Sequence, residues 1–283
     1  MRAAADPTSP DPNPRGRAAA TVFAARRRLA RIVSLARWGR DAALRYPPTP
    51  TGGVIYAIGD IHGRSDCLRR AHALIDEDRN GAADGGSATE VYVGDYVDRG
   101  PDSKGAIELL VAREDVANVV ALRGNHEIML ESFLGGLTSF EDWRRFGGLE
   151  TILSYGVDAR ALLERGTIRP RDLAEKMPAS HLRFLTSLKS IHASGRYCFA
   201  HAGIRPGVPL EAQSLDDTAW IRDDFLNHPG DGALVVVHGH SPVGEVAFHA
   251  NRINIDTGAY LTNRLSVLRI GADGPRLLER RGP

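Results

Sequence analysis

The chain has 283 residues, 42% of them hydrophobic, which is enough for one large domain or two small ones with a buried core. Its 36 Lys and Arg residues nearly balance its 35 Asp and Glu residues, so net charge does not favour a nucleic-acid partner, and we expect no DNA binding. Its two cysteines, Cys67 and Cys198, exclude a disulfide framework and a four-cysteine zinc site. No apolar run approaches the roughly 20 residues that span a bilayer. We expect a cytoplasmic globular protein.

The first fifty residues form a predicted extension. Met1 to Arg17 are rich in Pro, Ala, Asp and Arg, a composition typical of disorder. Thr21 to Leu44 combine helically spaced apolar residues with many arginines, which predicts a basic amphipathic helix. One interpretation is a helix packed on the domain with a solvated Arg face, and the other is a weak contact with an anionic membrane, a nucleic acid or a partner. The proline-rich segment Tyr46 to Pro50 marks the predicted boundary of the extension, which we define as residues 1–50.

Beyond this boundary, extended and helical patterns alternate. Short apolar runs predict buried strands at Val54 to Ile58, Glu90 to Val93 and Val116 to Leu122. Helical patterns lie between them, at Ser65 to Asp78 and Ser103 to Arg113. This β-α-β-α-β order predicts parallel strands with right-handed connections.

The second half of the chain begins with a helical insertion, predicted for residues 128–190. Strands follow at Arg196 to Ala200 and Ala233 to Val237. Glu245 to Phe248, Arg252 to Ile255 and Leu265 to Ile270 have the pattern of antiparallel strands that close a second sheet. We therefore predict a catalytic domain over residues 51–273 and a short tail over 274–283.

Metal-type ligands follow the predicted strands. Asp60 and His62 can converge on one ion if the chain between them is still extended, although an isolated Asp-x-His pair is weak evidence. The accumulation of such positions is what indicates a site. Four more side chains each follow a strand-like run and a small residue, namely Asp95, Asn125, His201 and His240.

These six residues predict two divalent ions. A carboxylate that bridges two ions holds them about 3.5 to 4 Å apart, which suits in-line phosphoryl displacement, and Asp95 is the candidate bridge. One ion takes Asp60, His62 and Asp95, and the other takes Asp95, Asn125, His201 and His240. Mixed imidazole and carboxylate ligands favour Mn, Fe or Zn over Mg or Ca, and we expect Mn. Water between the ions loses a proton near neutral pH and becomes the nucleophile.

Further side chains have predicted roles in proton transfer and phosphate binding. His126 is adjacent to a ligand but outside the ligand set, so it can protonate the leaving group, and Asp98 can orient it. Arg99 and Arg222 are candidates to bind phosphate, because guanidinium makes bidentate contacts with phosphate oxygens. For Arg222 a structural salt bridge is the alternative.

Three residues have predicted supporting roles. Arg123 pairs with Glu127 or another nearby acid and so supports the ligand loop. His238 lies on the same side of its strand as His240 but farther back. Asp256 either orients a ligand histidine or only caps a turn.

The motifs together resemble a known family. Gly59 to Gly63 read GDIHG, Gly94 to Gly100 read GDYVDRG, and Arg123 to Glu127 read RGNHE, with HAG at His201 and GH at His240. In order and spacing they resemble the phosphoprotein phosphatase branch of the calcineurin-like metallophosphoesterases. The resemblance covers about Val54 to Ile270. It implies the dinuclear site described above and an α/β (mixed α+β) fold, a β-sandwich of two mixed sheets flanked by helices.

The resemblance leaves the substrate open. Compact bacterial members include serine/threonine protein phosphatases and symmetrical diadenosine tetraphosphatases. We favour a phosphorylated protein or peptide, because Trp220 to Phe225 and Arg144 to Gly148 resemble the bacterial protein phosphatases. A nucleotide is the alternative substrate. A more remote alternative is a non-catalytic binding module that acts through the N-terminal basic helix.

Overall fold

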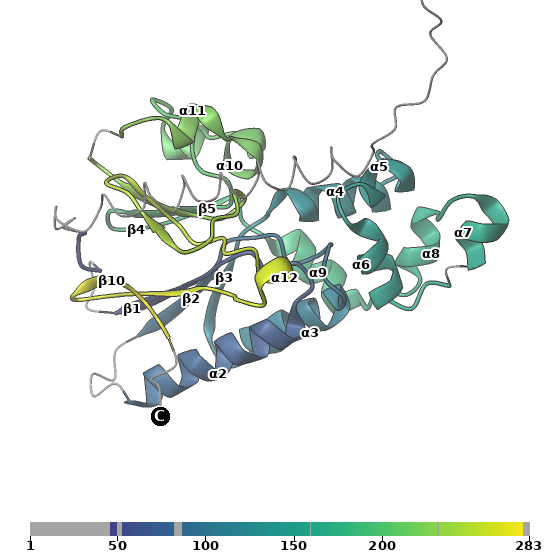
Figure 1. Ribbon diagram of the computed structural model, residues 1–283, viewed down its shortest axis with the longest axis horizontal. Helices are drawn as coiled ribbons and strands as arrows, with labels where there is room; N and C mark the ends of the chain where they lie inside the picture. The colour runs from purple at the N-terminus through teal and green to yellow at the C-terminus, as the bar shows by residue number, and fades with distance from the viewer. Residues whose placement is uncertain (1–45, 50–52, 82–86, 159, 231, 280–283) are drawn as a thin grey trace, which may run out of the picture. The chain divides into compact units, whose positions relative to one another are not determined.

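A computed structural model describes residues 46–49, 53–81, 87–158, 160–230 and 232–279. The predicted disordered segment and the predicted basic helix of the N-terminal extension lie outside these residues. Figure 1 shows two β-sheets that pack face to face, with helices on their outer faces. The predicted sandwich of two mixed sheets is therefore confirmed.

The first sheet has the strand order β10-β9-β1-β2-β3. Three adjacent strands, β1 (Val54–Ile58), β2 (Ala88–Tyr92) and β3 (Asn118–Ala121), are parallel, as predicted. The connecting helices are α2 (Ser65–Gly81) and α3 (Ser103–Glu114), which Figure 1 shows on the outer face. Because parallel strands of one sheet end at the same edge, the loops after β1, β2 and β3 lie together.

The second sheet has the order β4-β5-β6-β8-β7. Its strands are β4 (Ile191–Ser194), β5 (Tyr197–Ala200), β6 (Val235–His238), β7 (Ala247–Phe248) and β8 (Arg252–Asn254). Strands β5, β6 and β8 are parallel, and the antiparallel β4 and β7 form the edges.

The prediction for the last three strands was wrong in two respects. Strand β8 runs parallel to β6, and β9 (Val267–Gly271) belongs to the first sheet, where it pairs antiparallel with β1. The sequence of β9 is apolar enough to be buried on both faces. Such a run shows that a strand is buried, but not which strand it pairs with.

The side chains of β1 alternate between two cores because successive strand residues point to opposite faces. Ile55 and Ala57 pack between the sheets with residues of the second sheet such as Phe199 and Val237. Tyr56 and Ile58 instead pack under the helices. Both faces of β1 are therefore buried, which explains its uninterrupted apolar sequence.

Short helices fill the predicted insertion. They are α4 (Asn125–Leu134), α5 (Phe140–Arg144), α6 (Gly148–Ser154), α7 (Arg160–Arg165), α8 (Pro170–Ala174) and α9 (Ala179–Ser187). The side chain of Trp143 in α5 is fully buried in the core that these helices share with the first sheet. Two further helices, α10 (Leu215–Trp220) and α11 (Asp223–Leu226), lie over the outer face of the second sheet in Figure 1, and α12 (Ala259–Thr262) follows β8.

Segments beyond both predicted boundaries of the catalytic domain contact it. The Tyr197 hydroxyl donates to the Pro47 carbonyl at 2.7 Å, and the Tyr46 hydroxyl donates to the His249 carbonyl at 2.8 Å. Residues 46–49, at the end of the predicted extension, thus pack on the domain. At the other end, β10 (Gly274–Leu277) pairs with β9, so the predicted tail contains a strand. Neither segment is apolar enough to be recognised as a strand or a core segment without its partner.

A buried ion cluster lies on the helical side of the first sheet. The Arg113 guanidinium donates to Glu90 at 2.7 Å and to Asp76 at 2.6 Å. Tyr92 also donates to Glu90, at 2.7 Å, and its oxygen lies 2.9 Å from His72 Nε2. The Glu90 side chain, 1% exposed, therefore has several hydrogen-bond donors.

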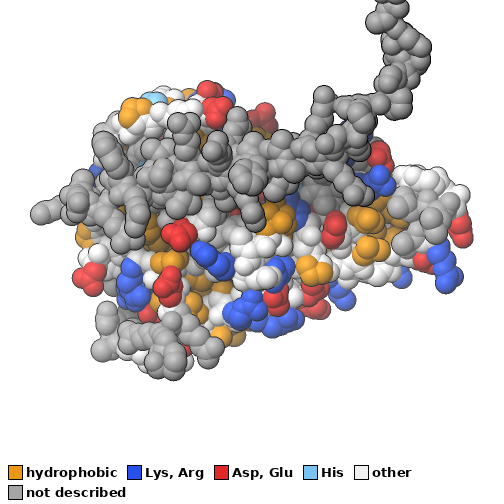
Figure 2. All heavy atoms as spheres, viewed as in Figure 1, with side chains coloured by type: hydrophobic (Ala, Val, Ile, Leu, Met, Phe, Trp, Pro, Cys, Tyr) orange, Lys and Arg blue, Asp and Glu red, His pale blue; other side chains and the backbone are white. Residues whose placement is uncertain are grey.

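The surface mixes charges of both signs. Figure 2 shows basic and acidic side chains interspersed over the described part of the visible face. Within the described residues, no helix is both long enough and apolar enough to cross a membrane.

Candidate metal centre

The loops after five strands of the two sheets supply the predicted ligands. Asp60 follows β1, Asp95 follows β2, and Asn125 opens α4 directly after the β3 loop. From the second sheet, His201 follows β5 and His240 follows β6. Both sheets therefore contribute to one buried cluster, because the carboxyl ends of their parallel strands lie at the same edge of the sandwich.

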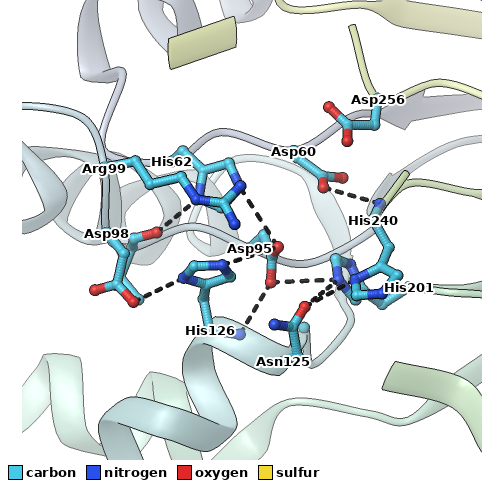
Figure 3. Close-up of polar contacts among 12 residues, drawn as sticks. Asp60, His62, Asp95, Asp98, Arg99, Asn125, His126, His201, His240 and Asp256 are labelled. Carbon is cyan, nitrogen blue, oxygen red and sulfur yellow. Dashed lines mark hydrogen bonds and ion pairs between the residues drawn. The ribbon is translucent and has the colours of Figure 1, made fainter. Parts of the chain in front are cut away.

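Asp95 lies at the middle of the cluster, between two groups of nitrogen ligands (Figure 3). Its Oδ2 is 3.5 Å from His62 Nε2 and 3.9 Å from His126 Nε2. Its Oδ1 is 3.3 Å from His201 Nε2. Potential ligand atoms of Asp95, His201 and His240 all lie within 4.8 Å of one another, and so do those of His62, Asp95 and His126. Asp95 is thus the residue that the two groups share.

The ring orientations of two histidines direct lone pairs into the cluster. His62 Nδ1 is 3.0 Å from the Val97 carbonyl, and His201 Nδ1 is 3.0 Å from the Val93 carbonyl. Because a carbonyl oxygen only accepts, each Nδ1 donates, and in the neutral tautomer each Nε2 is left with a lone pair. The Nε2 of His201 faces Asn125 Oδ1 at 3.1 Å. Two acceptors at that separation suit a cation that binds both.

Buried polar atoms without partners give a second indication of a cation site. Among the described residues, Asp60 Oδ1 and His240 Nε2 are buried and have no hydrogen-bond partner. Buried polar atoms are paired in the great majority of cases, so two such atoms on predicted ligand residues need an explanation. Cations bound to this nitrogen and oxygen set fit the cluster, and the set is of the kind that Mn, Fe and Zn prefer.

Burial controls the charge states of the cluster. It lowers the pKa of both His62 and His240 to about 3, so both imidazoles are neutral, as metal ligands must be. Burial, followed by the negative charges of Asp256 and Asp95, raises the pKa of Asp60 well above its usual range. Bound cations would reverse this effect, because they favour the ionised carboxylate.

Asp60 contacts the loop after β6. Its Oδ2 accepts the His240 backbone N–H at 2.9 Å, and it lies outside the two groups of closely spaced ligand atoms. His126 lies beside His62, with ring centroids 4.6 Å apart. The chain at His62 is not extended, as the convergence of Asp60 and His62 required, because its φ is +45°.

Left-handed backbone is concentrated at this centre. Of six non-glycine residues with positive φ in the described chain, five are predicted site residues: His62, Asp95, Asp98, Arg99 and His240. Such conformations cost of order 1 to 3 kcal/mol each and persist where the surroundings enforce them. Gly124 allows the close approach of two loops, since a Cβ there would collide with the backbone nitrogen of Asp95.

His126 and Asp98 form a buried pair. His126 Nδ1 donates to Asp98 Oδ2 at 2.7 Å, and both side chains are fully buried. Although burial disfavours the charged imidazole, the carboxylates of Asp95 and Asp98 raise the pKa of His126. Trp143 Nε1 donates to Asp98 Oδ2 at 3.0 Å, and the Thr151 hydroxyl donates to Oδ1 at 2.7 Å. Asp98 is therefore fixed by hydrogen bonds on both of its oxygens.

Trp143 and Thr151 were not predicted from the sequence. They are separated from Asp98 by 45 and 53 residues. No local pattern connects them to the GDYVDRG motif. Only the packing of α5 and α6 against the loop after β2 brings them to the site.

Of the two predicted alternatives for the partner of Arg123, Glu127 is not the acid that pairs with it in the described structure. Its carboxylate accepts four backbone N–H groups, from Asp95 (2.9 Å), Tyr96 (2.7 Å), Val97 (3.2 Å) and Gly124 (3.0 Å). Glu at the third position of α4, reaching back to the residue before the helix, follows a known helix-start pattern that could have indicated this role. Glu127 thereby joins the loop after β2 to the start of α4.

The two predicted phosphate-binding arginines lie at the edge of the centre. Arg99 Nη1 is 2.9 Å from His62 Nε2, and its guanidinium lies 5.0 Å from the centre of the Tyr260 ring. Arg222 is exposed, and its charge contributes to the lowered pKa of His240. Its Nη1 donates to the Ser241 hydroxyl at 3.3 Å, and it forms no ion pair within the described part of the chain. The alternative of a structural salt bridge is therefore not what the structure shows.

The three residues predicted to support the site differ in their contacts. Arg123 pairs with Glu131 at 3.1 Å, which is the "another nearby acid" alternative. Asp256 Oδ1 accepts the Gly258 N–H at 2.9 Å, so it caps a turn. His238 is buried, with Nδ1 3.0 Å from the Gly239 carbonyl, and contacts Phe225 rather than a ligand side chain.

A comparison with known protein families identifies the family of the chain. A family model described as calcineurin-like phosphoesterase matches residues 53–272. The chain belongs to this family. It is therefore a metallophosphoesterase, a class of hydrolases whose members normally bind divalent metals.

Relatives of this phosphoesterase carry two kinds of name. Serine/threonine-protein phosphatase 1 of Salmonella typhimurium is 29% identical over 76% of this chain and 91% of its own length. Bis(5'-nucleosyl)-tetraphosphatase PrpE of Oceanobacillus iheyensis, described as asymmetrical, is 30% identical over 75% of this chain and 86% of its own. A protein of Geobacillus thermodenitrificans with the same name is 29% identical over 75% of this chain and 88% of its own length.

Solved structures support the fold. A candidate diadenosine tetraphosphatase has a TM-score of 0.56 at 22% identity, covering 82% of this chain and 97% of the other. A cold-active protein-tyrosine phosphatase of a psychrophilic Shewanella species has a TM-score of 0.51 at 18% identity, covering 84% and 86%. At these identities the likeness shows a shared architecture.

Proposed function

We propose that this phosphoesterase is a dinuclear-metal-dependent phosphomonoesterase that hydrolyses phosphoserine and phosphothreonine in proteins. The observation that carries the proposal is the position of Asp95, whose two carboxylate oxygens are shared by two groups of imidazole nitrogen atoms. A carboxylate in that position is suited to bridge two ions. We propose Mn as the metal, and the cytoplasm, where both buried cysteines would be reduced, as the location.

We propose His62 and Asp95 for one ion, with Asp60 as a further ligand, and Asp95, Asn125, His201 and His240 for the other. When bound, the two ions supply charge stabilisation for phosphoryl transfer and activate water at neutral pH. Side chains of the protein supply proton donation and phosphate binding.

In the proposed mechanism His126 gives a proton to the departing oxygen. Its Nδ1 is held by Asp98 at 2.7 Å, which leaves Nε2 to face the substrate. The raised pKa of His126 maintains the protonated form that an acid needs. Arg99 and Arg222 hold the phosphate oxygens, one on each side of the cluster.

The test uses protein loaded with Mn and a phosphoserine peptide. Asp95→Asn and His126→Asn are each expected to reduce kcat by at least about 10²-fold, because each removes a group that acts only at the reacting atoms. Full activity in either variant would contradict the mechanism.

The relatives named tetraphosphatases favour a second candidate, hydrolysis of dinucleoside polyphosphates at the same centre. These relatives are named as asymmetrical tetraphosphatases, whereas the alternative predicted from the sequence is a symmetrical diadenosine tetraphosphatase. Relative turnover of diadenosine tetraphosphate and phosphopeptides separates the two candidates, and product analysis separates the two cleavage patterns.

A further inference from the structure

An open hollow of about 480 Å³ lies beside the metal centre. It is lined mainly by Arg99, Arg144, Arg145, Phe146, Glu150 and Tyr260. Three guanidinium groups and one carboxylate line it, so its charge favours an anion. A hollow of this size is in the range of small-molecule sites.

The lining arginines have little else to bind. Arg144 makes an exposed pair with Glu141 at 3.3 Å, of a kind that contributes little free energy. In the described structure the exposed Arg145 has no carboxylate partner. Both guanidinium groups can therefore bind a ligand without breaking a strong interaction.

The hollow is fixed to the catalytic loop. The Arg99 backbone N–H donates to the Gly147 carbonyl at 3.1 Å. Gly147 has a φ of +97°, and a Cβ there would press against the backbone of Arg99. The segment with Arg144 and Arg145 is thus held at a constant distance from the arginine proposed to bind phosphate.

The hollow adjoins His126, the proposed acid, through one of its lining residues. The ring of Phe146, which lines it, meets His126 edge to face with centroids 6.2 Å apart. If His126 protonates the departing oxygen, the atoms attached to that oxygen extend past Phe146 into the hollow.

We propose that this hollow binds a negatively charged group on the leaving-group portion of the substrate. The inference rests on the proposed function. The shared chemistry is a second anion a few bonds from the scissile phosphate, which is either an acidic residue beside the phosphorylated one or a further phosphate of a nucleotide. Arg144 and Arg145 are then specificity determinants that touch substrate outside the reacting atoms.

The test measures kcat/KM with Mn for three substrate classes. The first is a pair of phosphoserine peptides that differ only in Asp or Asn residues flanking the phosphoserine, the second is diadenosine tetraphosphate, and the third is para-nitrophenyl phosphate, which has no second anion. The protein is compared with Arg144→Gln/Arg145→Gln, with Glu150→Gln, and with Arg183→Gln, an exposed arginine of α9 outside the hollow.

We expect the double variant to lower the Asp-to-Asn peptide ratio, or the ratio of tetraphosphate to aryl phosphate, by about tenfold, because it loses charge-assisted hydrogen bonds. Glu150→Gln should raise the same ratio, and Arg183→Gln should leave it unchanged. A change in the peptide ratio identifies an acidic peptide, and a change in the nucleotide ratio identifies a polyphosphate.

Two results would overturn the inference, and they differ from each other. Unchanged ratios in all variants, with normal turnover of the aryl phosphate, overturn the anion site alone. Absence of turnover for every substrate by the unaltered protein overturns the proposed function and this inference with it.

Discussion

Two buried clusters of charged side chains differ in how their polar atoms are satisfied. Around Glu90, Arg113 and Tyr92 supply short hydrogen bonds. Around Asp95, the acceptor Asn125 Oδ1 faces His201 Nε2, which is also an acceptor in the neutral tautomer. Asp60 Oδ1 and His240 Nε2 have no hydrogen-bond partners in the described chain. Buried charges are stable only when they are paired. The first cluster is therefore complete within the fold, and the second needs ligands from outside it.

The two clusters also differ in backbone conformation. Glu90 and Arg113 lie in a regular strand and a regular helix, whereas Asp95 and His240 have positive φ. Strain together with unpaired polar atoms indicates a site that binds something. Charge burial alone does not distinguish a functional cluster from a structural one.

The largest expected effect is on activity at the second cluster. Asp95→Asn should lower kcat/KM for para-nitrophenyl phosphate by about 10³-fold, because the residue shared by both ligand groups is lost. The free energy of unfolding without metal should change by less than about 1 kcal/mol, since the amide oxygen still accepts the His126 N–H. Steady-state kinetics and urea denaturation measure the two quantities. A large loss of metal-free stability would show that Asp95 is structural.

At the first cluster, around Glu90, we expect a large effect on stability and a small effect on activity. Arg113→Met should lower the free energy of unfolding by about 3 to 5 kcal/mol, because it leaves Glu90 buried and short of its main partner. Activity per folded molecule should stay within about twofold. Urea denaturation at fixed metal concentration measures the loss.

The control for this change is Arg276→Met. Arg276 pairs with Asp78 at 3.0 Å but is 48% exposed, so its loss should cost less than about 1 kcal/mol. Equal losses in the two variants would mean that burial does not govern the cost.

Removing the metal should lower the free energy of unfolding through the cluster around Asp95 and not through the cluster around Glu90. At a metal concentration about 100-fold above Kd, binding adds about 2.7 kcal/mol to the free energy of unfolding, and a chelator should remove it. The increment should persist in Arg113→Met and be much reduced in Asp95→Asn. Thermal unfolding with and without chelator measures it. An increment retained in Asp95→Asn would place the metal elsewhere.

The smallest effect is a pH dependence at the first cluster. Burial, with the nearby Arg113 charge, lowers the pKa of His72 from 6.5 to about 4. Between these values the unfolded chain binds a proton that the folded protein does not, so stability falls as the pH falls from about 6.5 to 4, by at most about 1.4 kcal/mol per pH unit. His72→Gln should flatten the unfolding profile in this window. An unchanged profile would show that His72 makes no contribution.

The sequence determined many of the elements and the candidate ligands, because both depend on short segments. Apolar runs marked β1, β2 and β3, and each motif directly after a strand carried its ligand residues at fixed offsets. Parallel strands of one sheet end at one edge, so the convergence of Asp60, Asp95 and Asn125 followed from the order of elements.

The tertiary structure decided what depends on contacts between distant segments. Nothing local to β9 specified that it pairs with β1, and nothing near Asp98 indicated Trp143 or Thr151. The hollow between Arg145 and Tyr260 likewise exists only because the loop after α5 is hydrogen-bonded to Arg99. Local patterns fix which residues carry the chemistry, and long-range packing fixes which residues hold them in place and which surface meets the substrate.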